Sequence, residues 1–103
     1  MSGMFYECSS LKELNLSNFN TDKVKYMSDM FNGCSSLKIL NLINFKINHY
    51  TDIFNIFLNC ISLEELNISN SFYIVVKNDK NEYLPDESKL KIKEYIPIKK
   101  KFR

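Results

Sequence analysis

The segment MFNGCSSLKILNL, residues 30–42, places a cysteine beside a glycine and follows them with regularly spaced leucines. Residues of the same character recur 26 positions earlier and 26 positions later in the chain. The matching columns are Met4, Met30 and Ile56; Phe5, Phe31 and Phe57; Cys8, Cys34 and Cys60; Leu11, Leu37 and Leu63; Leu14, Leu40 and Leu66; and Leu16, Leu42 and Ile68. Columns that align without a gap indicate an internal repeat, and periods of about 20–50 residues are typical of stacked repeat architectures.

The first half of each unit has a helical period. Apolar residues of the stretch 21–34 fall three and four positions apart, which predicts a helix. Gly33 is the expected end of that helix, because glycine readily adopts the left-handed conformation that closes one. The equivalent positions hold Asn59, the next most tolerant residue, and Glu7, which is less suitable.

The second half of each unit has the period of a strand. In residues 39–43, Leu40 and Leu42 alternate with other residues, which predicts a short strand with one buried face. A single unit of this size cannot bury its apolar face alone, so neighbouring units must stack. The sequence therefore predicts an α/β solenoid in which about three helix–strand units of 26 residues share a parallel sheet.

We interpret the cysteine column, Cys8, Cys34 and Cys60, as structural: small apolar wedges where each helix meets its strand. A reactive thiol and an intermolecular bridge are the alternatives. Three cysteines cannot all pair within one chain, and stacked equivalents should lie too far apart for a disulfide. We expect no metal site, because His49 is the sole histidine and lies in a connecting stretch.

The residues also resemble a known family. MSGMFYECSSLKELNLSNFNTDKV (1–24) and MSDMFNGCSSLKILNL (27–42), with the weaker copy IFNIFLNCISLEELNIS (53–69), are similar to the BspA-like leucine-rich repeats. Those repeats occur in bacterial surface proteins, mycoplasma lipoprotein-type surface proteins and some parasitic protists. The resemblance implies a parallel leucine-rich-repeat solenoid on cell-surface proteins that mediate adhesion or protein contact, and it brings no catalytic residues.

The resemblance divides the chain into residues 1–71, the solenoid with units of about 1–26, 27–52 and 53–71, and residues 72–103. In the commoner leucine-rich repeat an asparagine closes the turn where this chain has Phe19, Phe45 and Ser71. We expect these phenylalanines to stack as an internal spine that ends at Ser71, where Phe72 can substitute by a one-residue slip.

The C-terminal third loses the period. Residues 72–76 (FYIVV) and 89–98 read as strands, with a turn at 77–82 between them, and predict a β-hairpin-like cap over the last unit. Residues 89–103 carry seven lysines and arginines against one glutamate. We interpret KKKFR at 99–103 as a solvated end, with weak contact to a membrane surface as the alternative, and expect no nucleic-acid partner. The longest apolar run is too short to span a bilayer.

The outward side chains of the strands form the candidate ligand-binding surface. They are Glu13, Asn15 and Ser17; Ile39, Asn41 and Ile43; and Glu65, Asn67 and Ser69. Exposed isoleucines between carboxylates resemble the apolar centre and charged rim of a contact surface. The asparagine column can instead be a structural ladder of side-chain amides.

These patterns favour a non-catalytic protein–protein interaction module without a cofactor. The chain has two glycines and no phosphate-binding loop, and its one histidine adjoins no nucleophile. A cell-surface or extracellular location follows from the resemblance, although residues 1–10 lack the pattern of a secretory signal. The alternative is a truncated or intracellular fragment with a scaffolding role, which self-associates through the uncapped first unit and its residues Met1, Met4, Phe5 and Cys8.

Overall fold

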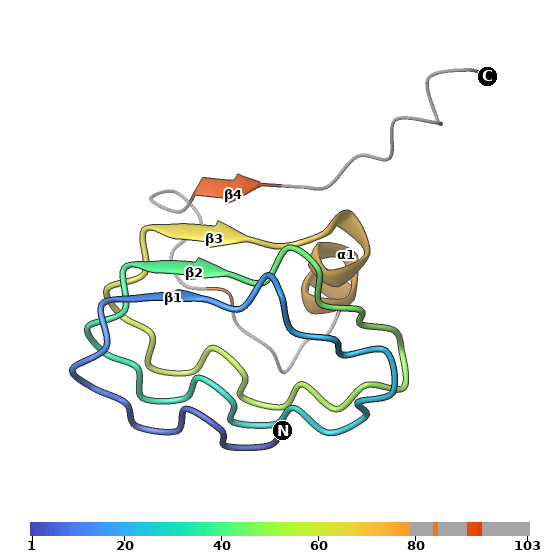
Figure 1. The fold of residues 1–103 in the computed structure, drawn as a ribbon, viewed down its shortest axis with the longest axis horizontal. Coiled ribbons are helices and arrows are strands. Elements are labelled where there is room, and N and C mark those ends of the chain that lie inside the picture. Colours follow the sequence, from blue (N-terminus) through green and yellow to red (C-terminus); the bar gives the residue numbers. More distant parts are fainter. Residues whose placement is uncertain (79–83, 85–90, 94–103) are drawn as a thin grey trace.

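The computed structural model describes residues 1–78, 84 and 91–93 of the 103-residue chain. Its elements are β1 (Glu13–Asn15), β2 (Ile39–Asn41), β3 (Glu65–Asn67), α1 (Asn70–Asn78) and β4 (Lys91–Lys93). The strands pair in parallel in the order β1-β2-β3-β4 (Figure 1). The described part is therefore a small α/β structure with a four-stranded parallel sheet and one short helix, which confirms the predicted class at that level.

The sheet is in register at the sequence offset of 26. Leu14 pairs with Leu40, Leu40 with Leu66, and Leu66 with Ile92. Leu40 and Leu66 are fully buried beneath the sheet. Because side chains alternate along a strand, a slip of one residue would turn these leucines to the solvent face, so their burial fixes the register.

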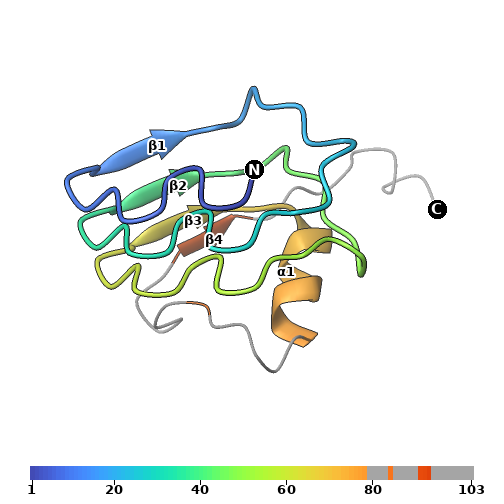
Figure 2. The ribbon, with the colours of Figure 1, turned by 90° about the horizontal axis from the view of Figure 1, so that it is seen from below.

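Three turn segments, residues 1–11, 27–37 and 53–63, run side by side on the opposite side of the core from the sheet (Figures 1 and 2). The predicted helix over 21–34 is wrong, because this stretch contains turns and no helix. The N–H groups of Asn32 and Cys34 close turns on carbonyls three residues earlier, whereas those of Asp29, Phe31 and Gly33 donate to carbonyls of the third turn segment at 2.8–3.1 Å. In a helix each N–H donates to the carbonyl four residues earlier in the same segment, so these bonds between segments replace helix formation.

Backbone conformation explains why the helix does not form. Asp29 and Gly33, four residues apart, have φ angles of 56° and 84°. The equivalent residues of the other two turn segments are also left-handed: Gly3, Glu7, Asn55 and Asn59. A helix needs a negative φ at every residue, so a left-handed residue in each turn excludes it. The expected left-handed conformation at Gly33 and its equivalents is confirmed, but it shapes successive turns and ends no helix.

The predicted strand at 72–76 is also wrong, because these residues belong to α1. Ser69 precedes the helix, and its Oγ accepts a hydrogen bond from the N–H of Phe72 at 3.2 Å, as an N-cap does. Phe72 and Val76, four residues apart, are the buried residues of α1. The strand predicted within 89–98 is present at β4, but the hairpin-like cap is wrong, because its other half is α1 and β4 pairs in parallel with β3. The remainder of the predicted turn, residues 79–82, and the basic end at 99–103 lie outside the described residues.

A stack of phenylalanine rings runs through the core. Phe5 lies on Phe31 with centroids 5.7 Å apart, Phe31 on Phe57 at 6.2 Å, and Phe57 on Phe72 at 6.0 Å. The internal spine predicted at Phe19 and Phe45, ending at Ser71, is wrong: Phe45 is buried, but Phe19 is 37% exposed. Phe72 was expected to extend the column of Phe19 and Phe45. It instead stacks on Phe57 and ends the column of the turn-segment phenylalanines.

Candidate functional site

The outer face of the sheet holds the residues that the sequence singled out. Their rows are aligned as predicted: Glu13 pairs with Ile39 and Ile39 with Glu65, and the three asparagines pair in the same order. Ser17, Ile43 and Ser69 follow two residues beyond the ends of β1, β2 and β3. Neither the turn segments nor α1 lies over this face (Figure 1).

Exposure on this face decreases from the first row to the third. Glu13 and Asn15 are exposed, Asn41 is half-buried, and Asn67 is 8% exposed. Ser17, Ile39, Ile43, Glu65 and Ser69 are half-buried. The two isoleucines are therefore less exposed than expected, but they still contribute apolar surface at the centre of the face.

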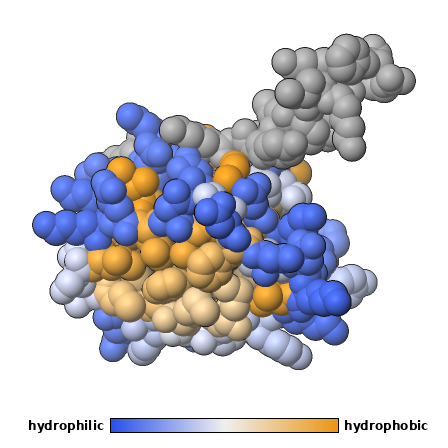
Figure 3. Space-filling view, in the orientation of Figure 1, coloured by the Kyte–Doolittle hydropathy of each residue, from blue (hydrophilic) through white to orange (hydrophobic). Residues whose placement is uncertain are grey.

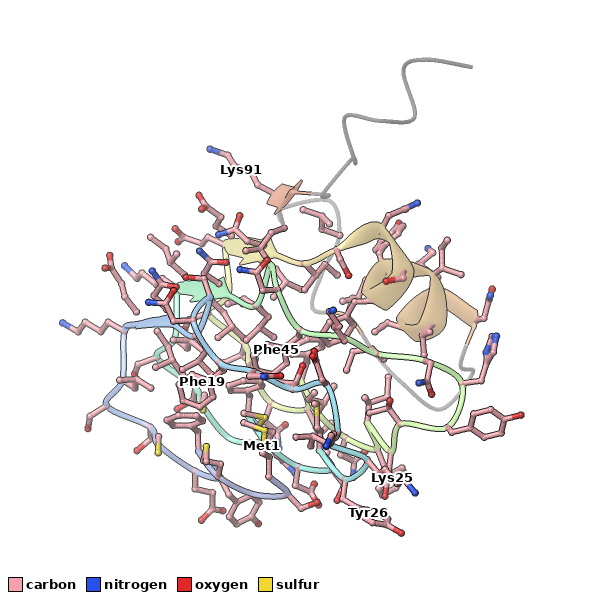
Figure 4. All side chains as sticks on the ribbon, turned by 45° about the vertical axis from the view of Figure 1, so that its right-hand side comes forward. Met1, Phe19, Lys25, Tyr26, Phe45 and Lys91 are labelled. Carbon is pink, nitrogen blue, oxygen red and sulfur yellow. The ribbon has the colours of Figure 1, made fainter. Side chains whose placement is uncertain are left out.

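The structure adds a fourth row that the sequence reasoning missed. Lys91 of β4 is the register partner of Glu65, and its exposed side chain projects away from the body of the molecule (Figure 4). One more step of 26 residues from Leu66 reaches Ile92, so the signal was present in the sequence. The column across the four strands thus reads Glu13, Ile39, Glu65 and Lys91, with charges on both sides of an apolar position.

The asparagine column has a structural role in its first two rows. The side-chain oxygen of Asn15 accepts from the N–H of Ser17 at 2.9 Å, and that of Asn41 from the N–H of Ile43 at 3.1 Å. Such bonds turn the backbone at the end of a strand. In the third row the side-chain nitrogen of Asn67 donates to Glu65 at 3.3 Å instead. The bonds of Asn15 and Asn41 lie within their own segments, so their structural role is to turn the backbone.

A groove with a volume of about 660 Å³ continues the face at the carboxyl ends of the first three strands. Its lining residues are Phe19, Asn20, Asp22, Ile43, Asn44, Phe45, Lys46, Ile47, Ser69 and Ser71. Only Ile43 and Ser69 of these were in the predicted set. In parallel sheets, ligands commonly bind beyond the carboxyl ends of the strands.

Hydrogen bonds between the loops hold the walls of this groove. The hydroxyl of Thr21, which is 1% exposed, accepts from the N–H of Lys46 at 2.9 Å. Asn44 donates from its side chain to the carbonyl of Ser17 at 2.8 Å. The ion pair between Lys46 and Asp22, at 3.6 Å, is exposed on both sides and contributes little. Phe19 and Phe45, from the loops after β1 and β2, supply the aromatic wall (Figure 4).

The thiols are placed for packing and hydrogen bonding. Cys34 and Cys60 are buried, and their sulfurs donate to the carbonyls of Phe5 and Phe31 at 3.2 and 3.1 Å. Burial raises the pKa of the Cys34 thiol, and it raises that of Cys60 to about 12. A thiol that stays protonated at neutral pH is a poor nucleophile. Cys8 is half-buried, and all three thiols are free.

Residues 1–78, 84 and 91–93 contain no cluster of three or more histidine, cysteine or acidic residues that could hold a metal ion. His49 is exposed in the loop after β2. The described part of the chain has no helix that is long and apolar enough to cross a membrane.

Fold and face together define a small α/β protein with an open parallel sheet. The chain belongs to the family described as mycoplasma protein of unknown function, DUF285, whose model matches residues 1–89. Comparison with curated proteins and with solved structures gave no match. The matched range includes the first three strands and α1.

Proposed function

We propose that this chain is a short BspA-like leucine-rich-repeat solenoid that binds another protein through the outer face of its sheet. In this proposal, residues 1–71 form three units with a period of 26 residues, the last of them shorter (53–71). They have no catalytic activity or cofactor, and the protein works at the cell surface. The in-register pairing of Leu14, Leu40 and Leu66 supports the repeat. The surface class is proposed from the resemblance of the sequence motif, and the family match adds that the chain is of a mycoplasma type.

The observation that carries the proposal is the composition of the outer face of the sheet. Ile39 and Ile43 form an apolar centre, with carboxylates at Glu13 and Glu65 and the ammonium of Lys91 around it. Protein contact surfaces typically join an apolar centre to a polar rim. The adjoining groove, whose lining includes the partly exposed ring of Phe19, can hold a partner side chain.

The test replaces both central isoleucines, Ile39→Asp with Ile43→Asp. Two carboxylates at the centre of a contact surface should weaken binding by at least tenfold, since a few central residues supply most of the binding energy. The matched control is Ile61→Asp with Ile74→Asp, because those isoleucines are 80% and 46% exposed and belong to the third turn segment and α1.

The readout is capture of purified extracellular proteins on an array, with circular dichroism to verify the fold of each variant. We expect the wild-type chain and the control to capture the same protein, and the double variant at the face to lose it. Equal capture by all three chains would exclude the sheet face as the binding surface. Equal loss in both double variants would point to added charge as the cause and would also exclude it.

A further inference from the structure

The first turn segment and β1 expose an apolar end face. Each of its residues can be compared with the equivalent residue 26 positions later: Met4 is 50% exposed and Met30 fully buried, and Phe19 is 37% exposed where Phe45 is 1%. The other partly buried members are Met1, Phe5, Cys8, Leu11, Leu14 and Val24. Figure 3 views this end and shows a continuous hydrophobic patch across it. Soluble monomers rarely expose such continuous patches.

At the opposite end of the stack, α1 covers the turn segments. Phe72 of α1 lies on the ring of Phe57, the last of the turn-segment phenylalanines, and β4 pairs with β3. A second copy therefore cannot stack head to tail on this end without displacing α1. Two copies can bury their apolar ends together only when open end meets open end, which is a closed two-fold arrangement.

The edge of β1 offers backbone groups for this contact. The carbonyl of Lys12 accepts from the N–H of Ile39, and the N–H of Leu16 donates to the carbonyl of Asn41. The backbone N–H and carbonyl groups of the even-numbered residues along β1 therefore point toward β2. Alternation along the strand then directs the N–H and carbonyl groups of Glu13 and Asn15 to the outer edge. An exposed strand edge readily pairs with another strand.

We propose that a second copy of this chain covers the end face, with β1 of each copy paired antiparallel about a two-fold axis at Leu14. This arrangement places Glu13 of one copy opposite Asn15 of the other and gives four hydrogen bonds from two strands of three residues. It joins the two sheets into one and buries both apolar ends. It does not require the partner proposed for the outer face, although Glu13 and Phe19 belong to both surfaces.

The neighbouring registers are less favourable. Pairing centred on Glu13 would set two carboxylates directly opposite each other, and it would require the N–H of Leu11, which already donates to Cys8. Pairing centred on Asn15 would require the N–H of Ser17, which already donates to the side chain of Asn15. The register centred on Leu14 avoids both conflicts.

The experiment uses analytical ultracentrifugation of the full chain over a wide concentration range. We expect a monomer–dimer equilibrium. Asn15→Asp puts a carboxylate opposite Glu13 twice in each dimer while keeping an oxygen that can accept from Ser17, and it should weaken the dimer roughly 2- to 30-fold. Adding Glu13→Lys to that variant should restore or exceed the wild-type affinity. The control is Asn18→Asp, the same charge change at an exposed residue of the first loop, which should leave the affinity unchanged.

Hydrogen exchange supplies a second readout. The amides of Glu13 and Asn15 should gain protection as the concentration of the chain rises. A monomer at all concentrations would overturn the proposal, as would a dimer that is indifferent to the charge at residues 13 and 15. Open-ended assemblies, which indicate head-to-tail stacking, would overturn it as well.

Discussion

Replacing Gly33 by alanine tests how closely the first two turn segments pack. Gly33 has φ of 84°, and a Cβ placed on it would lie 2.9 Å from Cγ and 3.2 Å from Cα of Glu7. The side chain of Glu7 can move aside, but its backbone is held by the bond from its N–H to the carbonyl of Asn32, 2.7 Å long. The turn segments must therefore separate, or this hydrogen bond must stretch.

The cost of Gly33→Ala has three parts. A left-handed alanine costs about 1–2 kcal/mol, and a weakened hydrogen bond adds about 1 kcal/mol. The lower entropy of the unfolded chain returns about 0.4–1 kcal/mol. We expect the free energy of unfolding to fall by about 2 kcal/mol, measured by urea denaturation followed with far-UV circular dichroism.

Gly3→Ala is the matched control, because Gly3 occupies a left-handed turn with φ of 65° but its Cβ would meet only the Cβ of Tyr6, at 3.8 Å. The same backbone penalty applies without the close contact, so the expected loss is about 0.5–1 kcal/mol. Equal losses for the two variants would refute the idea that the contact between Gly33 and Glu7 limits how the turn segments pack.

Three further perturbations test the core, the thiols and the cap of α1. Phe31→Ala removes the fully buried ring that stacks on two others and should cost about 3–5 kcal/mol in urea denaturation; Phe5→Ala, at the open end of the stack, should cost much less, and similar costs would argue against the stack as the core. The pKa of Cys60 is raised from 9.0 to about 12, so the folded chain keeps a proton that the unfolded chain loses. Stability should be unaffected by this thiol below pH 9 and fall by about 1.4 kcal/mol per pH unit above it, up to about pH 12. Cys60→Ala should flatten the decline measured by denaturation at each pH, and an unchanged slope would show that burial does not hold the proton. Ser69→Ala removes the acceptor for the N–H of Phe72 and should cost about 0.5–2 kcal/mol with a loss of helical signal; full retention of both would show that α1 needs no cap.

The 26-residue offset predicted the sheet because parallel pairing repeats the same environment at each step. Leu40, fully buried between Leu14 and Leu66, occupies the expected place for that reason. The spacing of apolar residues within each unit, in contrast, misled the prediction of helices. Apolar residues three and four positions apart fit successive turns as well as a helix, and hydrogen bonds between neighbouring segments decide between the two. Asp29, Asn55 and Gly3, residue types that tolerate positive φ, were the available signal for turns.

The error at α1 has a different origin. FYIVV is rich in β-branched and aromatic residues, which favour strands in isolation. In the folded chain, Phe72 gains a stacking partner in Phe57, and Val76 is buried four residues later. Helical spacing brings both side chains onto one face, whereas in a strand four residues would separate them by about 13 Å. Burial against the end of the ring stack thus overrides local propensity.

The position of each row in the stack determines how exposed its side chains are. The sequence could therefore predict which residues of the candidate surface lie side by side, but not which of them are most exposed. Asn15 and Asn67 are equivalent in sequence, yet Asn15 is exposed and Asn67 is 8% exposed, because β1 is an edge strand and β3 lies between two others. The free edge makes the first row suited to pairing with a second copy, while the half-buried isoleucines of the second row suit a partner that contacts the sheet from above. The dimer contact uses the outward backbone of Glu13 and Asn15, whereas the partner contact is centred on the side chains of Ile39 and Ile43. Those two isoleucines lie outside the proposed dimer contact. Ile39→Asp with Ile43→Asp should therefore weaken partner binding and leave the monomer–dimer equilibrium unchanged in the ultracentrifuge.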